Sequence, residues 1–366
     1  MALPTEKILL RSPYWITETD STLSYILINL RVWLGTLAEE PLDTTIRLRS
    51  TALNGVASVD ISELARDFVE VTLANTGEES NAVLISAVTT SVFLDGTATT
   101  AAKEYWLGLD GYGTFTDGAN YSVDSRLYMS TEVIRSYSET NNRIPVLAET
   151  FTGYRLQRRS YTGYSDLSTV SGLTAASNTA DAIDYVNTQI GGSYADRVVL
   201  EFSTGQDIIV DVEYAECNKY GFTPAFFVNR FGAVQQVHFT GKFSVSMASK
   251  DTKYTRNILE NGTYDKSRHQ EYVLSKNGKI SLELNTGWIP EEENDTYLEL
   301  LMSEQVWLKV ESNKFGVGFI PKQTATYTLP VHLTSKSLNV KSKLNDKLIN
   351  YTFKFEAAND WINSIR

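Results

Sequence analysis

Short runs in which apolar and polar residues alternate recur along the chain, and they constrain its fold more than any other feature. The run LSYILINLRVWL at 23–34 places Ile26, Ile28, Leu30 and Val32 on one side of an extended strand, and its other side is partly apolar, as expected in the middle of a sandwich sheet. A period of two is typical of a β-strand, because successive side chains point to opposite faces of a sheet. Further runs follow Thr44, Val83 and Asp207, and Gly, Asn and Asp turn sequences separate many of them. The sequence therefore predicts antiparallel strands joined by polar turns.

These strands are expected to form a mainly β protein, made of tandem antiparallel β-sandwich domains with a few short helices. The 366 residues suffice for two or three domains with substantial cores. Residues 1–118 are interpreted as an N-terminal β-sandwich with one helix. Residues 119–205, rich in Ser, Thr, Gly and Tyr, are interpreted as a loop-rich insertion or connecting region. Residues 206–366 are predicted to form a C-terminal β domain with one helix and a terminal tail.

Two helices and one hairpin have specific local signals. The first helix is predicted to begin after an N-cap at Asp60, with Glu63 completing a capping box and an apolar face made by Ile61, Leu64, Ala65 and Phe68. The second is predicted to begin at Pro290, with acidic residues 291–293 in its first turn and an apolar stripe of Tyr297, Leu298, Leu301 and Met302. The pair Asn277-Gly278 predicts a two-residue hairpin turn, because both positions of such a turn require positive φ.

Charge and cysteine content limit the partners and the compartment. The net charge is −11, which disfavours a nucleic-acid partner, because neutralising phosphates requires a basic face. Cys217 is the only cysteine, so no intrachain disulfide can form. The first ten residues lack the basic and apolar segments of a signal peptide. No apolar run approaches the ~20 residues that span a bilayer, so no membrane partner is expected.

The sequence contains no recognisable catalytic or cofactor motif. His238, His269 and His332 are far apart and form no metal-ligand spacing, and neither a nucleophile elbow nor a phosphate-binding loop is present. Convergent carboxylates of a glycosidase stay an open alternative, because two acidic residues can meet from distant parts of a β fold. The chain is therefore expected not to be an enzyme, with no catalytic, cofactor-binding or metal-binding residues assigned.

Tyrosines and arginines interleave in one polar segment. Tyr154, Tyr161 and Tyr164 alternate with a group of basic residues that includes Arg158 and Arg159. Such a cluster fits a subunit interface, where Tyr and Arg are enriched, and this is the favoured interpretation. A surface that stacks on sugar rings or on nucleic-acid bases is the alternative.

Several blocks of the sequence resemble virion structural proteins of tailed bacteriophages that infect marine bacteria and Bacteroidota. In the second half these blocks are AECNKYGFTPAFFVNRFGAVQQVHFTGK at 215–242, YTRN at 254–257, LNTGWIPEEENDTYLELLMSEQVWL at 284–308 and the segment 333–366. In the first half they are RSPYWI at 11–16, VDISELARDFVE at 59–70 and DGYGTFTDGAN at 110–120. Residues from about 120 to 205 are largely outside the resemblance.

The resemblance implies a structural component of a phage particle that forms an oligomeric ring in the tail or baseplate. Its partners would be other copies of itself and neighbouring virion proteins, and its location the virion, assembled in the host cytoplasm. A repeated head-to-tail interface closes into a ring when its rotation allows. Trp361 and Arg366 near the chain end are further candidates for subunit contact. A neck or head–tail connector component, or a β-sandwich that binds host glycans, are the alternative functions.

Overall fold

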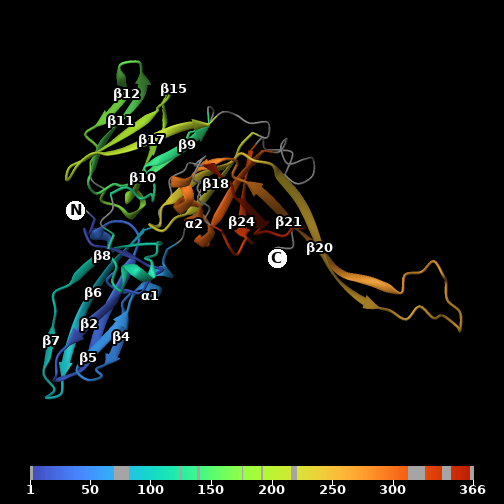
Figure 1. The fold of residues 1–366 in the computed structure, drawn as a ribbon. Coiled ribbons are helices and arrows are strands. Elements are labelled where there is room, and N and C mark those ends of the chain that lie inside the picture. Colours follow the sequence, from blue (N-terminus) through green and yellow to red (C-terminus); the bar gives the residue numbers. More distant parts are fainter. Residues whose placement is uncertain are drawn as a thin grey trace. The chain divides into compact units, whose positions relative to one another are not determined.

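The structure is a computed structural model, and it describes residues 3–69, 82–123, 126–137, 141–174, 176–190, 193–215, 221–311, 326–339 and 348–362. It confirms the predicted fold class, because the chain is mainly β, with several antiparallel sheets and two α-helices in the described ranges (Figure 1). Four short 3-10 turns supplement them, at Leu37–Glu39, Phe115–Asp117, Thr179–Asp181 and Glu291–Glu293. No helix in these ranges is both long and apolar enough to cross a membrane.

The chain divides into two compact units. Unit 1 comprises Met1–Glu216, Phe227–Gln236 and Glu292–Ser303, and unit 2 comprises Cys217–Phe226, Val237–Glu291 and Glu304–Arg366. The expected boundary near residue 118 therefore falls inside unit 1, and two short segments from the second half of the chain also belong to that unit.

The first half of unit 1 is a two-layer β structure. Its main sheet has the order β1-β8-β6-β3-β4, with β7 paired to β6, and a β2–β5 ribbon accompanies it. These strands are β1 (Lys7–Leu9), β2 (Trp15–Thr19), β3 (Leu23–Trp33), β4 (Ile46–Thr51), β5 (Val56–Asp60), β6 (Ala82–Phe93), β7 (Ala98–Thr100) and β8 (Glu104–Leu109). Ile26, Ile28 and Leu30 of β3 are completely buried, and they pack in one core with Ile16 of β2 and Ala57 of β5. The alternation predicted for residues 23–34 therefore faces the core as expected.

Residues 119–205 contain more strand than their composition suggested. They include β9 (Val133–Tyr137), β10 (Arg143–Leu147), β11 (Phe151–Ser160), β12 (Gly163–Ser171), β13 (Ile183–Asn187), β14 (Gln189–Ile190), β15 (Ser193–Tyr194) and β16 (Arg197–Phe202). Strands β9, β11, β12 and β16 form the sheet β12-β11-β16-β17-β9 together with β17 (Ile208–Ala215). Strands β10 and β13 form a ribbon whose residues share its core, and β14 pairs with β15. The segment is polar because the outer part of the β11–β12 hairpin exposes nearly all of its side chains, and Ser, Thr and Tyr are compatible with strands.

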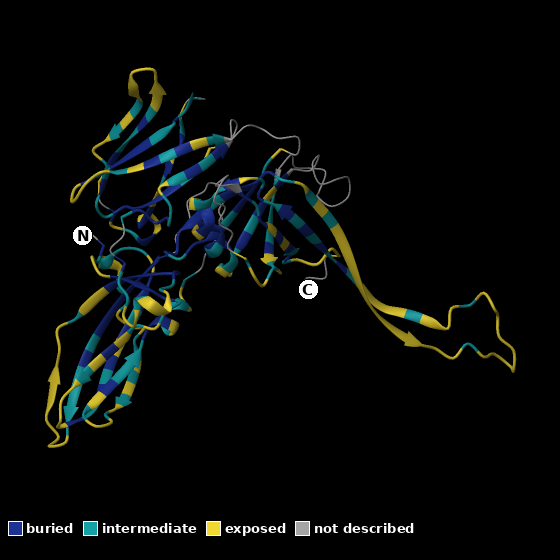
Figure 2. Cartoon of the chain, viewed as in Figure 1, coloured by how far each residue is buried: buried dark blue, intermediate teal, exposed yellow. Residues whose placement is uncertain are grey.

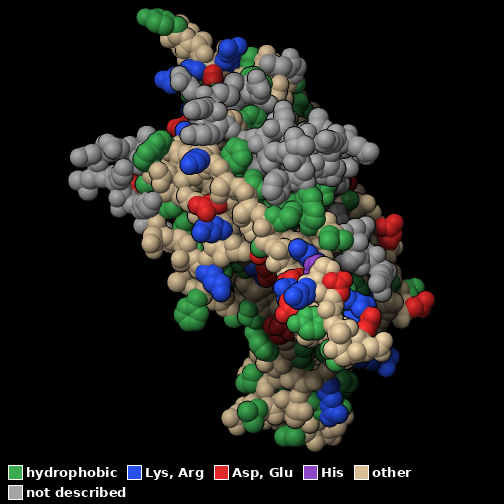
Figure 3. All heavy atoms as spheres, turned by 90° about the vertical axis from the view of Figure 1, so that its right-hand side faces the viewer, with side chains coloured by type: hydrophobic (Ala, Val, Ile, Leu, Met, Phe, Trp, Pro, Cys, Tyr) green, Lys and Arg blue, Asp and Glu red, His purple; other side chains and the backbone are tan. Residues whose placement is uncertain are grey.

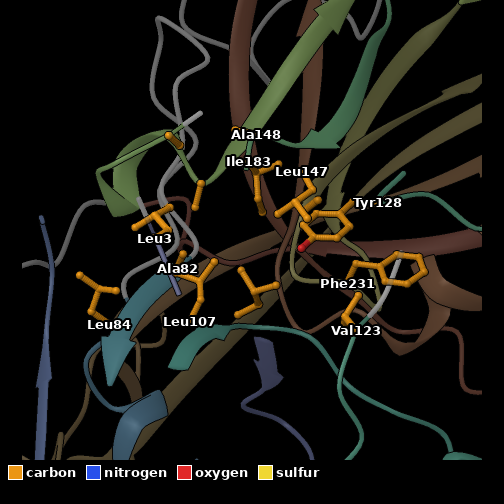
Figure 4. Packing of buried hydrophobic residues seen from close by; sticks show 14 of the residues in the cluster. Leu3, Ala82, Leu84, Leu107, Val123, Tyr128, Leu147, Ala148, Ile183 and Phe231 are labelled. Atoms are coloured by element: carbon orange, nitrogen blue, oxygen red, sulfur yellow. The ribbon is translucent and has the colours of Figure 1, made fainter. Parts of the chain in front are cut away.

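A third core connects these two parts of unit 1. Leu84 of β6, Leu107 of β8, Ile183 of β13 and Phe231 belong to one buried cluster, in which Phe231 stacks on Tyr128 with ring centroids 5.8 Å apart (Figure 4). On β6, Val83 and Ile85 point into the first core, and Ala82 and Leu84 point into this one. The main sheet is therefore buried on both faces here.

The buried side chain of Asn229 supports this third core. Its Nδ2 group donates to the Tyr128 carbonyl at 2.7 Å and to Gln235 Oε1 at 3.1 Å. Its Oδ1 atom accepts from the N–H groups of Phe231 and Ala233 at 3.0 and 3.1 Å. All four hydrogen-bonding positions of the amide are thus satisfied without solvent.

Unit 2 contains most of a seven-stranded sheet in the order β19-β18-β23-β24-β26-β21-β20, in which the parts of β18 and β19 within 227–236 are assigned to unit 1. The strands are β18 (Thr223–Val228), β19 (Val234–Phe239), β20 (Phe243–Thr255), β21 (Glu271–Asn285), β23 (Val306–Glu311), β24 (Thr326–Leu333) and β26 (Thr352–Ala357), and β22 (Ile289–Pro290) pairs with β25 (Leu348–Ile349). Phe353 and Phe355 are fully buried on β26, and the ring of Phe239 contacts both edge-on, with centroids 5.8 and 5.6 Å away. This aromatic group forms the centre of the unit.

Both predicted helices exist, but each differs in detail. Helix α1 spans Ser62–Arg66 and its N-cap is Ile61, one residue later than predicted. Asp60 still helps it begin, because its Oδ1 atom accepts the N–H of Ser62 at 2.9 Å. The predicted apolar residue Phe68 lies beyond the helix and is exposed.

Helix α2 spans Asn294–Met302, after residues 291–293 form a 3-10 turn. Its buried face contains Thr296, Tyr297 and Leu300, whereas Met302 is exposed, so the predicted stripe was wrong by part of a turn. Two glutamates also belong to the buried set: Glu293 at the N-cap and Glu299 within the helix. The prediction that residues 291–293 fill the first turn of this helix is therefore wrong, because they precede it and Glu293 is its N-cap.

The hairpin predicted at Asn277-Gly278 is wrong. Strand β21 runs without interruption through both residues, and Asn277 and Gly278 pair with Lys250 and Ser249 of β20. A tight turn lies instead at Asn261-Gly262, within the segment 256–270 that connects the two strands, where φ is 51° and 80°. Both Asn-Gly pairs have the residue types that a tight turn requires. Only Asn261-Gly262 forms one, because the β20–β21 ladder keeps Asn277-Gly278 within a strand.

Candidate functional site

The outer part of the β20–β21 hairpin, residues 246–276, is the most exposed element of unit 2, and we call it the arm. None of its residues is buried, and Figure 2 shows an almost continuous run of exposed positions along both strands. The arm extends beyond the strands that flank β20 and β21 in the sheet (Figure 1). An isolated two-stranded hairpin is only marginally stable in water, so an arm of this length gains little from its own fold.

Cross-strand contacts hold the two strands of the arm together. Tyr254 and Tyr272 face each other with ring centroids 5.9 Å apart, and the guanidinium of Arg256 lies 5.2 Å from the Tyr272 ring centroid. Near the turn, Arg268 forms an ion pair with Glu260. Because exposed contacts of this kind each contribute roughly 0.2–1 kcal/mol, they order the arm without burying it.

Large apolar side chains of the arm face solvent. They are 41–71 % exposed and comprise Met247, Tyr254, Leu259, Tyr264, Val273 and Leu274. In Figure 1 the arm points to the right, and Figure 3 shows the molecule from that side. On this face, hydrophobic side chains lie among Lys, Arg, Asp and Glu side chains. Apolar side chains gathered on one projecting element are typical of an interaction surface.

The charge of the arm is opposite to that of the rest of the chain. Residues 246–276 contain six Lys and Arg against four Asp and Glu, a net charge of +2. Since the whole chain carries −11, the remaining residues carry −13. The arm is thus electrostatically complementary to the average surface of the chain that carries it.

The edges of the arm offer unpaired backbone groups. Strand β20 is the last strand of its sheet, and in the described ranges β21 pairs on its other side with β26 only over Ser281–Asn285. Exposed edges of this kind can pair with a strand of another chain.

The predicted Tyr and Arg cluster is divided by the structure. Arg158, Arg159 and Tyr164 lie on the outer half of the β11–β12 hairpin, and Tyr161 occupies its turn with a fully exposed side chain. Tyr154 lies at the base of the hairpin instead, half-buried against Phe151 with ring centroids 6.2 Å apart, and burial raises the pKa of its hydroxyl. Four of the five residues therefore share one projection, and Tyr154 belongs to the packing of the sheet.

An open cleft of about 830 Å³ lies beside this hairpin, within unit 1. It is lined by Arg159, Ser160, Tyr164, Asp196, Asp211, Val212, Glu213 and Tyr214. The guanidinium of Arg197 lies 3.9 Å from the ring centroid of Tyr164 and donates to Asp211 Oδ1 at 2.7 Å. Asp196 accepts the backbone N–H of Arg159 at 2.7 Å, and the Tyr214 hydroxyl donates to the Ala195 carbonyl at 2.7 Å. Hydrogen bonds and a cation–π contact thus fix much of the polar lining in place.

Sequence reasoning found only two residues of this cleft, Arg159 and Tyr164. Asp196 and Arg197 come from a different part of the chain, where no motif marks them. Asp211 and Glu213 are the polar members of the alternating run DIIVDVEYAE, so their position on one face of a strand was predictable. Their proximity to Tyr164 depends on the strand order β12-β11-β16-β17, which the sequence does not reveal.

The C-terminal candidates have different outcomes. The Trp361 side chain is partly exposed, and its backbone N–H donates to the Gly278 carbonyl at 2.7 Å. Asn277 Oδ1 accepts the N–H of Ile362 at 2.9 Å, so this end of the described chain lies against β21 of its own unit. Arg366 lies outside the described residues, and a role for either residue in subunit contact stays a prediction.

Two buried carboxyl groups in unit 1 have strongly perturbed acidity. Burial raises the pKa of Glu293 to about 7, although the nearby Arg135 guanidinium opposes this effect. Burial also raises the pKa of Glu299 to about 7, and hydrogen bonds from the Ser130 hydroxyl and the Arg230 backbone N–H limit the rise. Neither residue belongs to a group of three or more potential metal ligands in the described ranges, and the clearest consequence of the raised pKa values concerns stability.

The histidines occupy unrelated environments. His238 is buried with the Phe222 ring edge-on at 5.8 Å, whereas His269 is exposed in the arm and His332 is exposed on β24. Across the described ranges, no three His, Cys, Asp or Glu side chains are placed to hold a metal ion together. Cys217 lies outside these ranges.

Comparison with known proteins gives no assignment for the chain. No family model matches it, and no curated protein matches its sequence. Among solved structures, it aligns with fibronectin(III)-like modules of Clostridium thermocellum CbhA at 10 % identity and a TM-score of 0.17, covering 58 % of this chain and 92 % of that one.

Two other structures align similarly weakly. A structure concerning cell-surface retention of a 1.5-MDa bacterial ice-binding adhesin gives 9 % identity and a TM-score of 0.16, covering 78 % of this chain and 92 % of that one. The E. coli alpha-2-macroglobulin gives 10 % identity and a TM-score of 0.21, covering 90 % of this chain and 22 % of that one. Similarity at this level carries no argument about function.

Proposed function

We propose that this chain is a structural subunit of a tailed-phage particle, and that copies of it assemble through the arm into an oligomeric ring of the tail or baseplate. The observation that carries the proposal is the arm itself: residues 246–276 comprise two paired strands and the segment that connects them, with no buried residue and with six large apolar side chains in solvent. The sequence blocks that resemble phage virion proteins supply the particle context, with the virion, assembled in the host cytoplasm, as the proposed location.

The geometry of the arm favours another protein as its binding partner. Its apolar side chains gain free energy only when another surface removes them from water, at about 25 cal/mol per Å² of apolar area. Its unpaired edges can add to a sheet edge of the partner through backbone hydrogen bonds. Both features are characteristic of an element that folds on one subunit and is buried by the next.

Charge favours a second copy of this chain as that partner. An arm of net charge +2 approaches a chain whose other residues carry −13, so attraction is expected between the arm of one copy and the body of another. A contact of this kind is heterologous, since the arm meets a different surface, and repeated heterologous contacts close into a ring or extend as a stack. Neighbouring virion proteins would then bind the assembled ring.

Shortening the arm tests the proposal. Replacing residues 252–275 with Asn-Gly joins Asp251 to Lys276, which are direct partners across the ladder, and keeps the inner half of the hairpin. The mass of each protein is measured by light scattering after gel filtration, with negative-stain images of the same fractions. We expect discrete oligomers with rotational symmetry for the full chain, and a folded monomer for the shortened chain.

Matched double variants provide controls of full length. Leu259→Ser with Leu274→Ser alters two exposed leucines of the arm, and Leu42→Ser with Leu53→Ser alters two exposed leucines of unit 1. The arm pair should abolish assembly and the other pair should leave it unchanged. A monomeric wild type under all conditions, or equal assembly of the shortened chain, would contradict the proposal.

A further inference from the structure

We propose that the cleft beside the β11–β12 hairpin binds a neutral oligosaccharide, a function beyond the assembly role assigned to the arm. The cleft has a volume of about 830 Å³ and lies on unit 1, whereas the arm belongs to unit 2. Small-molecule clefts in proteins usually measure ~300–1,000 Å³, so its size suits a ligand of a few sugar rings.

The aromatic part of the lining suits the apolar face of a pyranose. Arg197 covers one side of the Tyr164 ring, yet the Tyr164 side chain stays 39 % exposed and lines the cleft. Sugar rings present a face of C–H groups that packs on an aromatic ring, and a ring held in place loses little conformational freedom when it binds. Tyr164 is therefore the stacking residue of the proposed site.

The polar part of the lining suits hydroxyl groups. A hydroxyl both donates and accepts, and it is satisfied by a carboxylate together with a guanidinium. Asp196, Asp211 and Glu213 supply acceptors in the cleft, and Arg159 supplies donors. Asp196 and Asp211 are already oriented by Arg159 N–H and by Arg197, so these acceptors are positioned before a ligand arrives.

The charge of the cleft selects among sugars. The lining has three carboxylates and one guanidinium group, that of Arg159, and Arg197 beside it pairs with Asp211, which leaves a net charge of −1. Sulfated or uronic-acid polymers would be repelled by this lining, and a neutral glycan would not. The ligand class is therefore a neutral oligosaccharide.

The ligand test uses the full-length protein and a panel of defined hexasaccharides. The neutral members are α-1,4-glucan, β-1,4-glucan, β-1,3-glucan and β-1,4-mannan, and the anionic members are polygalacturonate and hyaluronan. Binding is measured by calorimetric titration and by saturation-transfer NMR, at millimolar concentrations of each sugar. At least one neutral hexasaccharide is expected to bind, and the anionic members are expected not to bind.

Two tyrosines three positions apart provide a matched pair of variants. Tyr164→Ala should weaken binding about tenfold or more, equivalent to ~1.4 kcal/mol, whereas Tyr161→Ala should leave it unchanged because Tyr161 does not line the cleft. Tyr164→Phe keeps the ring and should bind like the wild type, because the proposed contact is made by the ring and not by the hydroxyl group. Failure of every neutral sugar to bind, binding of anionic sugars only, or equal binding by Tyr164→Ala would overturn the proposal. Assembly is measured separately by mass, so either proposal can fail without the other.

Discussion

Replacing Glu293 with glutamine should make the protein more stable at alkaline pH. The Glu293 carboxyl is buried, and its Oε1 atom has no hydrogen-bond partner among the described residues. Desolvation penalises the charged form and is the largest reason that its pKa rises from 4.5 to about 7. The Arg135 guanidinium opposes the rise, and the carboxylates of Glu213 and Glu292 add to it.

The direction of the pH effect follows from proton linkage. Below about pH 4.5 the carboxyl is protonated in both the folded and the unfolded chain, so its pKa shift costs no stability. Between pH 4.5 and 7 the folded chain binds the proton more tightly, so the free energy of unfolding falls as pH rises through this window. Above pH 7 the loss is complete, and a shift of this size corresponds to about 3 kcal/mol.

The Glu293→Gln variant removes this proton-linked loss. At pH 8 its free energy of unfolding should exceed that of the wild type by up to about 3 kcal/mol, and at pH 4.5 the two should be similar. Glu299 has a comparably raised pKa and stays in the variant, so part of the pH dependence should persist. Urea denaturation followed by tryptophan fluorescence, at half-unit steps from pH 4.5 to 8.5, measures both quantities.

The neighbouring residue Glu292 provides the control, because its side chain is exposed. Glu292→Gln should change the pH dependence little. The reasoning would be refuted if Glu293→Gln had the pH dependence of the wild type, or if it were less stable than the wild type at pH 8.

Three further predictions test the packing and the corrected hairpin. Asn229→Ala leaves four buried backbone and side-chain partners without a hydrogen bond, so it should destabilise the third core of unit 1 by ~3 kcal/mol or more in urea denaturation, and a loss below ~1 kcal/mol would contradict its supporting role. Phe353→Ala should cost roughly 3–5 kcal/mol in the same assay, since the ring is fully buried among aromatic neighbours, and a near-neutral result would contradict its central place in the core of unit 2. Gly262→Ala should destabilise the arm turn by about 1 kcal/mol because Gly262 has a φ of 80°, whereas Gly278→Ala in the strand should be tolerated, and hydrogen exchange of arm amides would reveal the opposite order if Asn277-Gly278 were the turn.

Strand periodicity was the part of the fold that the sequence could predict. Ile26, Ile28 and Leu30 are buried as their alternation indicates, because a side-chain period of two is a property of the extended backbone itself. The same reasoning failed for residues 119–205, where polar composition was interpreted as loop. A strand whose faces both meet water needs no apolar alternation, so the outer β11–β12 hairpin has no periodic signal.

Features that depend on pairing between distant segments could not be predicted from the sequence. Two Asn-Gly pairs meet the requirements of a tight turn, and the ladder between β20 and β21 selects Asn261-Gly262. Acidic residues are common where a helix begins, and Glu293 fits this pattern, yet the tertiary packing around α2 buries its side chain. The cleft is similarly non-local, since its lining comes from β11, β12 and β17 and from the residue before β16.

The most direct test of the assembly role is to find what the arm touches in solution. A photoreactive amino acid is placed at Leu274, which is 71 % exposed on the arm, in an equal mixture of nitrogen-14 and nitrogen-15 full-length chains. After illumination, mass spectrometry distinguishes crosslinks between copies, which contain both isotopes, from crosslinks within one copy. We predict mixed-isotope crosslinks from the arm to a single acidic surface of another copy. Crosslinks confined to one copy, at protein concentrations well above those used for gel filtration, would contradict arm-mediated assembly.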